Sequence, residues 1–249
     1  MPAELSEAER FVALAAREIA DAKVLFVGIG VPSLAAIAAK RTHAPKSVLV
    51  YESGAIDALP PVPPLSTGSP SVVANTAMVT TCLGVFAMLQ RGEFDLGLLS
   101  AAQVDRHGNL NSTQLGPRER PKVRLVGSGG AHDIAALARE LIIMMPHDPR
   151  RFVEKVDFVT SPGLSPTGNA RRKRGGGPKL LVTPRARFTF AVGELTLDAV
   201  ADGVTREEAL EGIPWAVPVS EEFCALPPVT PELGAAAREV LRLWGRDTG

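Results

Sequence analysis

The sequence predicts an α/β fold in three layers, a mostly parallel sheet with helices on both faces. Over roughly the first 160 residues, short apolar runs alternate with segments whose apolar residues repeat at helical spacing. Several of these runs end in glycine-containing turns. Strands that alternate with helices are typical of a parallel sheet covered on both sides. The chain has no internal repeat and no clean boundary, so residues 1–249 are predicted to form a single domain.

The elements of the first part of the chain follow from capping and periodicity. Ser6 and Glu9 have the spacing of a capping box, which predicts a helix over the apolar repeat that follows. Buried strands are predicted at residues 23–27, 48–51, 95–99, 123–126, 141–145 and 156–159. Helices are predicted at 34–40, at 81–90 and from the glycine turn at 127–130 to residue 140. The proline-rich stretch 58–71 is predicted to be a long ordered loop.

The last part of the chain is predicted to close the sheet. Residues 179–183 and 188–192 have the apolar and β-branched composition of strands. Helices are predicted at 204–211 and 231–244, and Thr230 is placed to cap the second of them.

Charge and cysteine content exclude several classes of protein. Lys and Arg number 27, and Asp and Glu number 27, so the formal net charge is zero and no nucleic-acid partner is expected. Cys82 and Cys224 lie far apart without a Cys/His cluster, which argues against a disulfide framework and a structural metal site. The polar, acidic N-terminus does not resemble a secretory signal, and no apolar run approaches the roughly 18 residues of a membrane span. We therefore expect a cytoplasmic protein without a membrane-spanning segment.

Three predicted strands end in glycine-containing turns, at residues 28–30, 52–54 and 127–130. The carboxyl ends of parallel strands line the ligand crevice of such sheets, and backbone N–H groups in glycine-rich turns face anions there. None of the turns matches a P-loop or a dinucleotide-binding motif, and a plain tight turn explains each of them about as well. Glu52 directly follows a buried strand, where an unpaired buried carboxylate is costly. Glu52 therefore either faces the crevice or forms a cap or an ion pair.

Four segments carry a family resemblance in their order along the chain. They are residues 50–54, 102–111, 127–131 and 151–163. Together they resemble the β subunit of class I CoA-transferases of the glutaconate and 3-oxoadipate type, over residues 8 to 185. The resemblance implies the CoA-transferase fold, which is similar to that of ribose-phosphate isomerases.

The resemblance also implies a catalytic site. The glutamate of the family's E-S-G motif is the nucleophile, which corresponds to Glu52 and implies a glutamyl–CoA thioester intermediate. The family's G-x-G-G loop implies that Gly129 and Gly130, together with Ser128, bind the oxyanion and CoA. Gln103 is a further candidate donor, although a structural role at a strand end fits it equally well.

The remaining candidate residues favour structural interpretations. The implied reaction needs no proton transfer, so His107 is interpreted as a turn residue and His132 as a surface residue near the glycine loop. The cations from Arg171 to Arg174 are more typical of a solvated loop than of a contact to CoA phosphates.

Class I enzymes combine two chains of the same fold type, so the resemblance implies an α subunit and an active site between α and β. It implies no permanently bound cofactor, because CoA enters as the acyl-CoA substrate. An acyl-CoA hydrolase or decarboxylase on the same scaffold, and a non-catalytic CoA-binding partner subunit, are the alternatives. The hydrolases and decarboxylases of the family replace the glutamate that this chain retains, which favours CoA transfer.

Overall fold

The computed structural model describes residues 4–164 and 175–245. Its strands are β1 (Val24–Val27), β2 (Val48–Val50), β3 (Ala55–Ile56), β4 (Met78–Val79), β5 (Leu96–Leu99), β6 (Gln103–Val104), β7 (Leu110–Asn111), β8 (Gln114–Leu115), β9 (Val123–Arg124), β10 (Glu140–Met144), β11 (Pro178–Val182), β12 (Ala186–Thr189), β13 (Thr196–Val200) and β14 (Val219–Ala225). Its helices are α1 (Glu7–Arg17), α2 (Val31–Arg41), α3 (Cys82–Gln90), α4 (Ala131–Leu137), α5 (Arg206–Leu210) and α6 (Pro231–Trp244), with a 3-10 turn at Pro70–Val73.

One sheet of ten strands runs through the described chain in the order β14-β13-β12-β11-β10-β5-β1-β2-β3-β4. Its centre, from β11 to β2, is parallel throughout. Strands β12 and β13 on one side, and β3 and β4 on the other, extend the centre in antiparallel fashion, and β14 pairs parallel to β13. The mostly parallel sheet predicted from the sequence is therefore confirmed.

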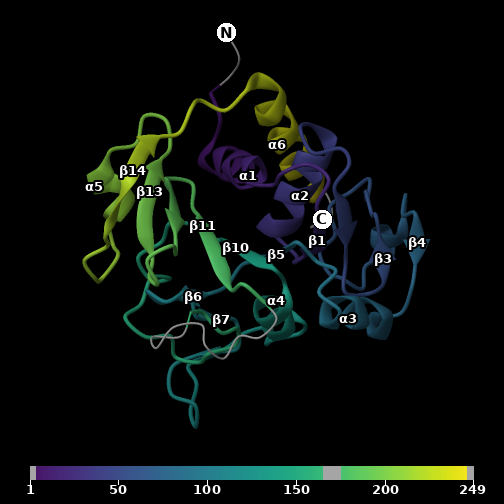
Figure 1. Cartoon of the computed structure of the whole chain (residues 1–249), viewed down its shortest axis with the longest axis horizontal. Helices are drawn as coiled ribbons and strands as arrows, with labels where there is room; N and C mark the ends of the chain where they lie inside the picture. Colours follow the sequence, from purple (N-terminus) through teal and green to yellow (C-terminus); the bar gives the residue numbers. More distant parts are fainter. Residues whose placement is uncertain (1–3, 165–174, 246–249) are drawn as a thin grey trace.

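Helices cover both faces of the sheet, which confirms the three layers (Figure 1). Helices α1, α2 and α6 pack on one face, against side chains such as Leu25, Leu49 and Leu98. Helices α3 and α4 pack on the opposite face, against a second core that contains Phe26 and Val50. Alternate residues of each central strand supply the two cores, as expected for strands buried on both faces.

Hydrogen bonds confirm two predicted helix caps. The Ser6 side chain accepts from the Glu9 N–H, and the Glu9 carboxylate accepts from the Ser6 N–H, which completes the capping box of α1. Thr230 caps α6 by accepting from the N–H of Leu233.

Cys82 and Cys224 are both exposed and unpaired. Within the described ranges, no helix has the length and apolar character needed to cross a bilayer.

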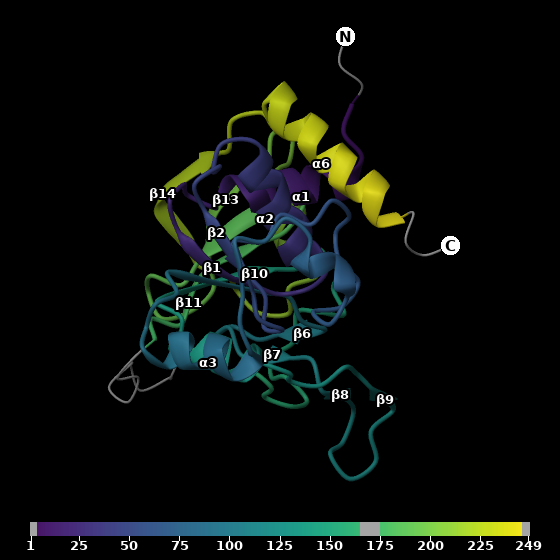
Figure 2. The ribbon, with the colours of Figure 1, turned by 90° about the vertical axis from the view of Figure 1, so that its right-hand side faces the viewer.

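Two predicted strands are wrong. Residues 156–159 form no strand, because Val156 is buried while the Asp157 N–H donates to the side chain of Gln103 instead of joining a ladder. The apolar run at 123–126 contributes only the short β9, which pairs with β8 in a separate hairpin. Figure 2 shows this hairpin projecting from the body of the molecule. The run therefore does not belong to the parallel sheet.

Gly97 in β5 allows α4 to approach the sheet closely. A Cβ at this position would lie 2.5 Å from Cγ2 of Ile134 and 3.2 Å from Cβ of Ala138. A Cβ cannot lie this close to Ile134, so the observed distance between α4 and the sheet requires glycine at position 97. Because α4 begins directly after the 127–130 turn, Gly97 also sets the position of that turn.

We expect Gly97→Ala to lower the free energy of unfolding by about 1–3 kcal/mol, because the added methyl group forces α4 away from β5. Urea unfolding followed by circular dichroism measures the loss. Gly245→Ala is the matched control, since a Cβ there meets no atom within 4 Å. Equal stability of Gly97→Ala and the parent chain would contradict the close packing described for α4.

Candidate active site

The three glycine-containing turns meet at the carboxyl edge of the parallel strands. They surround a cavity of about 570 Å³. The cavity is lined by residues 26–30 at and beyond the end of β1, Glu52 after β2, residues 99–100 at the end of β5 and residues 126–131 before and in α4, together with residues 65–67, Ser112 and Ile134. This is the edge at which open α/β sheets bind ligands.

Glu52 is held at the cavity by a tight turn between β2 and β3. The preceding residue, Tyr51, is fully buried, and its hydroxyl lies 2.7 Å from the hydroxyl of Ser33 in α2. Gly54 follows with a φ of +116°, and a Cβ there would overlap the carbonyl oxygen of Thr80. Only glycine fits this turn, so the half-buried Glu52 side chain projects from an anchored backbone.

The second turn supplies a direct partner for the Glu52 carboxylate. The backbone N–H of Gly130 donates to Oε2 of Glu52 at 3.1 Å. A Cβ at Gly130 would lie 2.7 Å from that oxygen and 2.7 Å from Cζ of Phe86 in α3, so the approach requires glycine. Gly129 has a φ of +47° and completes the turn. The turn can therefore donate to the Glu52 carboxylate only because position 130 is a glycine.

Two helices begin at the cavity wall. Gly130 is the N-cap of α4, and Gly30, with a φ of +81°, is the N-cap of the 11-residue α2. Both N-cap residues line the cavity, and neither has a side chain that caps its helix, so the first backbone N–H groups of each helix have no side-chain cap. Helix N-termini carry partial positive charge, which favours negative charge that develops between them.

Comparison with known proteins identifies the family. The family model described as Coenzyme A transferase matches residues 8–204. The chain is 40% identical over 220 residues to one of the subunits of 3-oxoadipate CoA-transferase from Pseudomonas knackmussii, and the match covers 86% of this chain and 85% of that subunit. The chain belongs to the coenzyme A transferase family.

Further relatives and solved structures agree with this assignment. One subunit of glutaconate CoA-transferase from Acidaminococcus fermentans is 34% identical over 217 residues, which cover 83% of this CoA-transferase chain and 81% of the relative. The crystal structure of glutaconate coenzyme A-transferase from the same organism superposes with a TM-score of 0.84 at 30% identity and covers 94% of both chains. The decarboxylase AibA/AibB shares the fold, with a TM-score of 0.81 at 24% identity over 98% of both chains.

The structure brings most of the expected site residues of this CoA-transferase chain together. Glu52, Ser128, Gly129 and Gly130 all line the cavity. The Ser128 hydroxyl accepts from the backbone N–H of His132, which braces the turn against the first residues of α4.

Gln103 is not brought to the cavity. Its amide nitrogen donates to Oδ2 of Asp157, and its amide oxygen accepts from the side chain of Asn111 and the N–H of Asp157. Gln103 is buried in the β6–β7 hairpin, where these bonds hold Asp157 and Asn111. This geometry fits the structural interpretation of Gln103 better than the donor interpretation.

The two histidines have structural contacts. A ring nitrogen of His107 lies 3.4 Å from the carbonyl oxygen of Gly193, and one of the exposed His132 lies 3.1 Å from that of Thr160. Neither lines the cavity. The basic segment from Arg171 to Arg174 lies outside the described residues. In the described parts of the chain, no group of three or more His, Cys, Asp and Glu is placed to hold a metal ion.

Some lining residues were not identified from the sequence. Leu65, Ser66 and Thr67 come from the proline-rich loop, whose position directly after Glu52 was the available signal. Ser112 is held at the cavity by Gly127, because the Ser112 hydroxyl donates to the Gly127 carbonyl at 2.8 Å. No sequence pattern marks that contact.

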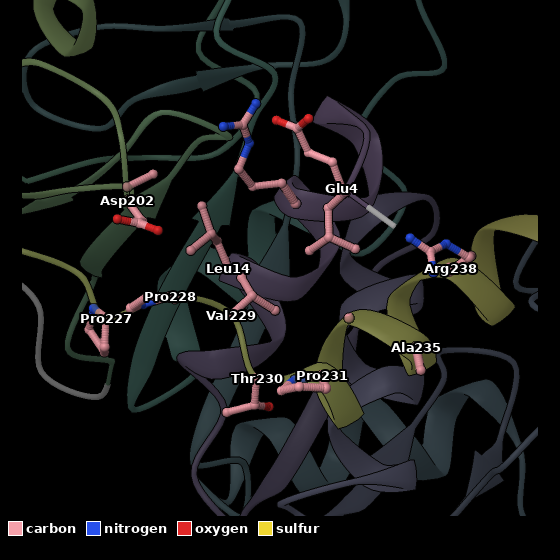
Figure 3. Close-up of a pocket in the computed structure, with 14 residues that line it drawn as sticks. Glu4, Leu14, Asp202, Pro227, Pro228, Val229, Thr230, Pro231, Ala235 and Arg238 are labelled. Atoms are coloured by element: carbon pink, nitrogen blue, oxygen red, sulfur yellow. The ribbon is translucent and has the colours of Figure 1, made fainter. Parts of the chain in front are cut away.

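A separate cavity of about 470 Å³ lies between α1, α6 and the segment at 227–231 (Figure 3). None of its lining residues lines the Glu52 cavity. One of its two arginines, Arg238, is paired with Glu9 at 2.9 Å, which ties α6 to the start of α1. None of the expected site residues lines this cavity, so the Glu52 cavity is the candidate active site.

Tyr51→Phe is expected to destabilise the chain by about 1–3 kcal/mol, because it leaves the buried Ser33 hydroxyl without its partner. Burial raises the pKa of Tyr51 to about 12, so the phenol remains protonated and able to bond at neutral pH. Urea unfolding gives the loss. The double variant Tyr51→Phe/Ser33→Ala, which removes both partners, should lose less than Tyr51→Phe alone; a larger or equal loss would refute the assigned bond.

Proposed function

We propose that this chain is the β subunit of a heteromeric CoA-transferase, which moves CoA between an acyl-CoA and a free mono- or dicarboxylic acid. The observation that carries the proposal is the Glu52 carboxylate, placed at the carboxyl edge of the sheet and bonded to the Gly130 N–H. The relatives are named as subunits of 3-oxoadipate and glutaconate CoA-transferases, which supports the same reaction and a partner subunit.

The proposed reaction uses Glu52 as a covalent carrier of CoA. The carboxylate attacks the acyl-CoA carbonyl, the C–S bond breaks, and an acyl–glutamyl anhydride and CoA thiolate form. The thiolate attacks the glutamyl carbonyl and releases the first acid, which leaves a Glu52–CoA thioester. A second carboxylate then reverses both steps. Each step exchanges one acyl bond for another, so no proton donor and no net oxidation is required.

The hydrogen bond to Gly130 fits the charge changes of these steps. Attack of thiolate on the glutamyl carbonyl converts that oxygen into an oxyanion. The Gly130 nitrogen already lies 3.1 Å from Oε2 of Glu52, and α4 begins with the next residue. Donors fixed in advance at a developing oxyanion lower the barrier without reorganisation. Oε1 of Glu52 is then the oxygen that attacks the acyl group, while Gly129 and Ser128 contact the CoA thioester.

A partner subunit completes the proposed site. Val126 at the cavity is 98% exposed, and Leu83 at the start of α3 is 80% exposed. Met78 and Val79 of the adjoining β4 are also exposed, and Leu65 at the cavity is 44% exposed. Exposed large aliphatic side chains, of which Val126 and Leu65 line the cavity, favour a surface that another protein covers. We propose that an α subunit covers it, excludes water from the thioester, and is required for activity.

The alternatives differ in the fate of CoA. A hydrolase or decarboxylase on this scaffold would act without an acceptor acid, and the structural similarity to AibA/AibB supports only the shared fold. A non-catalytic CoA-binding subunit would bind acyl-CoA without turnover. Dependence of CoA exchange on an added carboxylic acid distinguishes transfer from all three. The single domain and the cytoplasmic location stay predictions, the former supported by the continuous ten-stranded sheet.

Incubation of the αβ complex with acyl-CoA is expected to leave a CoA-mass adduct on the peptide that contains Glu52. Glu52→Gln keeps the size of the side chain but removes the attacking anion, so the adduct should vanish and kcat should fall by at least roughly 10³-fold. Glu93→Gln, an exposed glutamate paired with Arg91 beyond α3, is the matched control. The proposed function is excluded if the Glu52→Gln complex keeps full activity and the parent complex forms no CoA adduct.

Gly130→Ala is expected to lower kcat by roughly 10- to 100-fold, because the added Cβ displaces the Glu52 carboxylate from its donor. The φ of Gly130 is −80°, which alanine adopts freely, so backbone strain does not contribute to the loss. Steady-state kinetics of the αβ complex give the change, with Gly245→Ala as the control. Unchanged kcat in Gly130→Ala would show that the contact with Glu52 has no catalytic role.

A further inference from the structure

A second cavity adjoins the Glu52 cavity. It has a volume of about 520 Å³ and is lined by residues 100–102, Ser112 and residues 124–126. Ser100, Ser112 and Val126 line both cavities, so the two spaces share a wall at these residues. The second cavity therefore extends the site beyond Glu52, toward the root of the β8–β9 hairpin.

The two cavities differ in charge. Glu52 is the only acidic residue among the described residues that line them, and Arg124 is the only basic one. Ala101, Ala102 and Leu125 give the second cavity a mostly apolar wall. An extended ligand that spans both spaces thus meets an anion in one cavity, a cation in the other, and small or apolar side chains in both.

Arg124 is oriented by a neutral partner. Its Nη1 donates to Oε1 of the buried Gln114 at 3.1 Å, directly across the β8–β9 pair. In the described chain, no acidic side chain forms an ion pair with Arg124. A guanidinium has five N–H donors in a fixed fork, so most of them are available to an anion.

The backbone connects Arg124 firmly to the glycine turn. The Leu125 N–H donates to the carbonyl of Thr113, and the Gly127 N–H donates to the carbonyl of Ser112. With the β8–β9 pair, these bonds form a continuous ribbon that ends at the 127–130 turn. Arg124 and Val126 of this ribbon both line the second cavity. The distance between the cation and the Glu52 site is therefore set by paired backbone.

We propose that Arg124 binds the remote carboxylate of a dicarboxylic substrate whose other carboxyl group reacts with Glu52. This proposal rests on the proposed CoA-transfer function and assigns a residue of this chain to the selection of the acid. A carboxylate at the far end is repelled from Glu52 and attracted to Arg124, and a planar carboxylate matches the guanidinium fork. The apolar wall between them suits a short methylene chain. The several phosphates of CoA would require more cations than the one that this cavity provides.

The test compares two acids of equal chain length, adipate and hexanoate, on the αβ complex. Calorimetry without acyl-CoA gives their dissociation constants, and the rate at which each acid discharges the preloaded Glu52–CoA thioester gives their reactivity. For Arg124→Gln we expect the adipate affinity and the half-saturating adipate concentration to worsen by roughly 10- to 100-fold. Hexanoate should change by less than about twofold, because it lacks the second anion. Arg124→Lys should lose less than Arg124→Gln.

Arg120→Gln is the matched control, since Arg120 is an exposed cation of the same hairpin that lines neither cavity. Equal losses for adipate and hexanoate, or no loss for either, would overturn the role of Arg124. So would a loss confined to loading by acyl-CoA, which would assign Arg124 to a CoA phosphate. If the parent complex binds adipate through Arg124 but forms no thioester, the proposed transfer reaction fails while the assignment of Arg124 stands.

Discussion

The short approach of the Gly130 N–H to the Glu52 carboxylate is the contact on which the site depends. It joins the end of β2 to the start of α4, two segments 78 residues apart in the chain. Three glycines make it possible at different levels: Gly97 lets α4 settle on β5, Gly130 leaves room for the carboxylate, and Gly54 closes the turn that presents Glu52. A side chain at any of these positions would open the contact by acting on a different element.

The surroundings of Glu52 suit a nucleophile better than a structural acid. No cationic side chain lines its cavity in the described chain, and the carboxylate is bonded to a neutral backbone donor. A buried ion pair would fix the carboxylate in its charged ground state and oppose its attack on a carbonyl. Backbone donors and helix ends, by contrast, stabilise the charge wherever it lies along the reaction. Arg124, the cation of the adjoining cavity, does not line the Glu52 cavity, which fits its proposed role in selecting the substrate.

Much of the fold could be predicted from the sequence because its central strands are buried on both faces and read as continuous apolar runs. The runs at 23–27, 48–51 and 95–99 correspond to β1, β2 and β5. Strand β14 was not predicted, because it lies at the edge of the sheet and its exposed residues Glu221 and Glu222 interrupt any apolar run. Residues 156–159 have a strand-like composition but are organised by the buried Gln103 side chain, a tertiary contact that no local pattern reveals.

The residues of the candidate site could likewise be predicted only in part from the sequence. Glu52 and the 127–130 turn were predicted because each stands at the end of a recognisable run, and the resemblance to CoA-transferases gave them roles. Gln103 was placed beside them on motif alone, and its side chain is engaged elsewhere. Arg124 had no distinguishing pattern, because its position follows from the ribbon that pairs residues 112–115 with residues 123–127.

The most direct test of the central claim follows oxygen rather than CoA. The αβ complex, loaded as the Glu52–CoA thioester, is given an acceptor acid labelled with oxygen-18 in both carboxylate oxygens for one turnover, and the mass of the Glu52 peptide is then measured. If the acid attacks the glutamyl thioester and CoA returns through the anhydride, one labelled oxygen remains on Glu52. Formation of the new acyl-CoA with no label in that peptide would contradict the account.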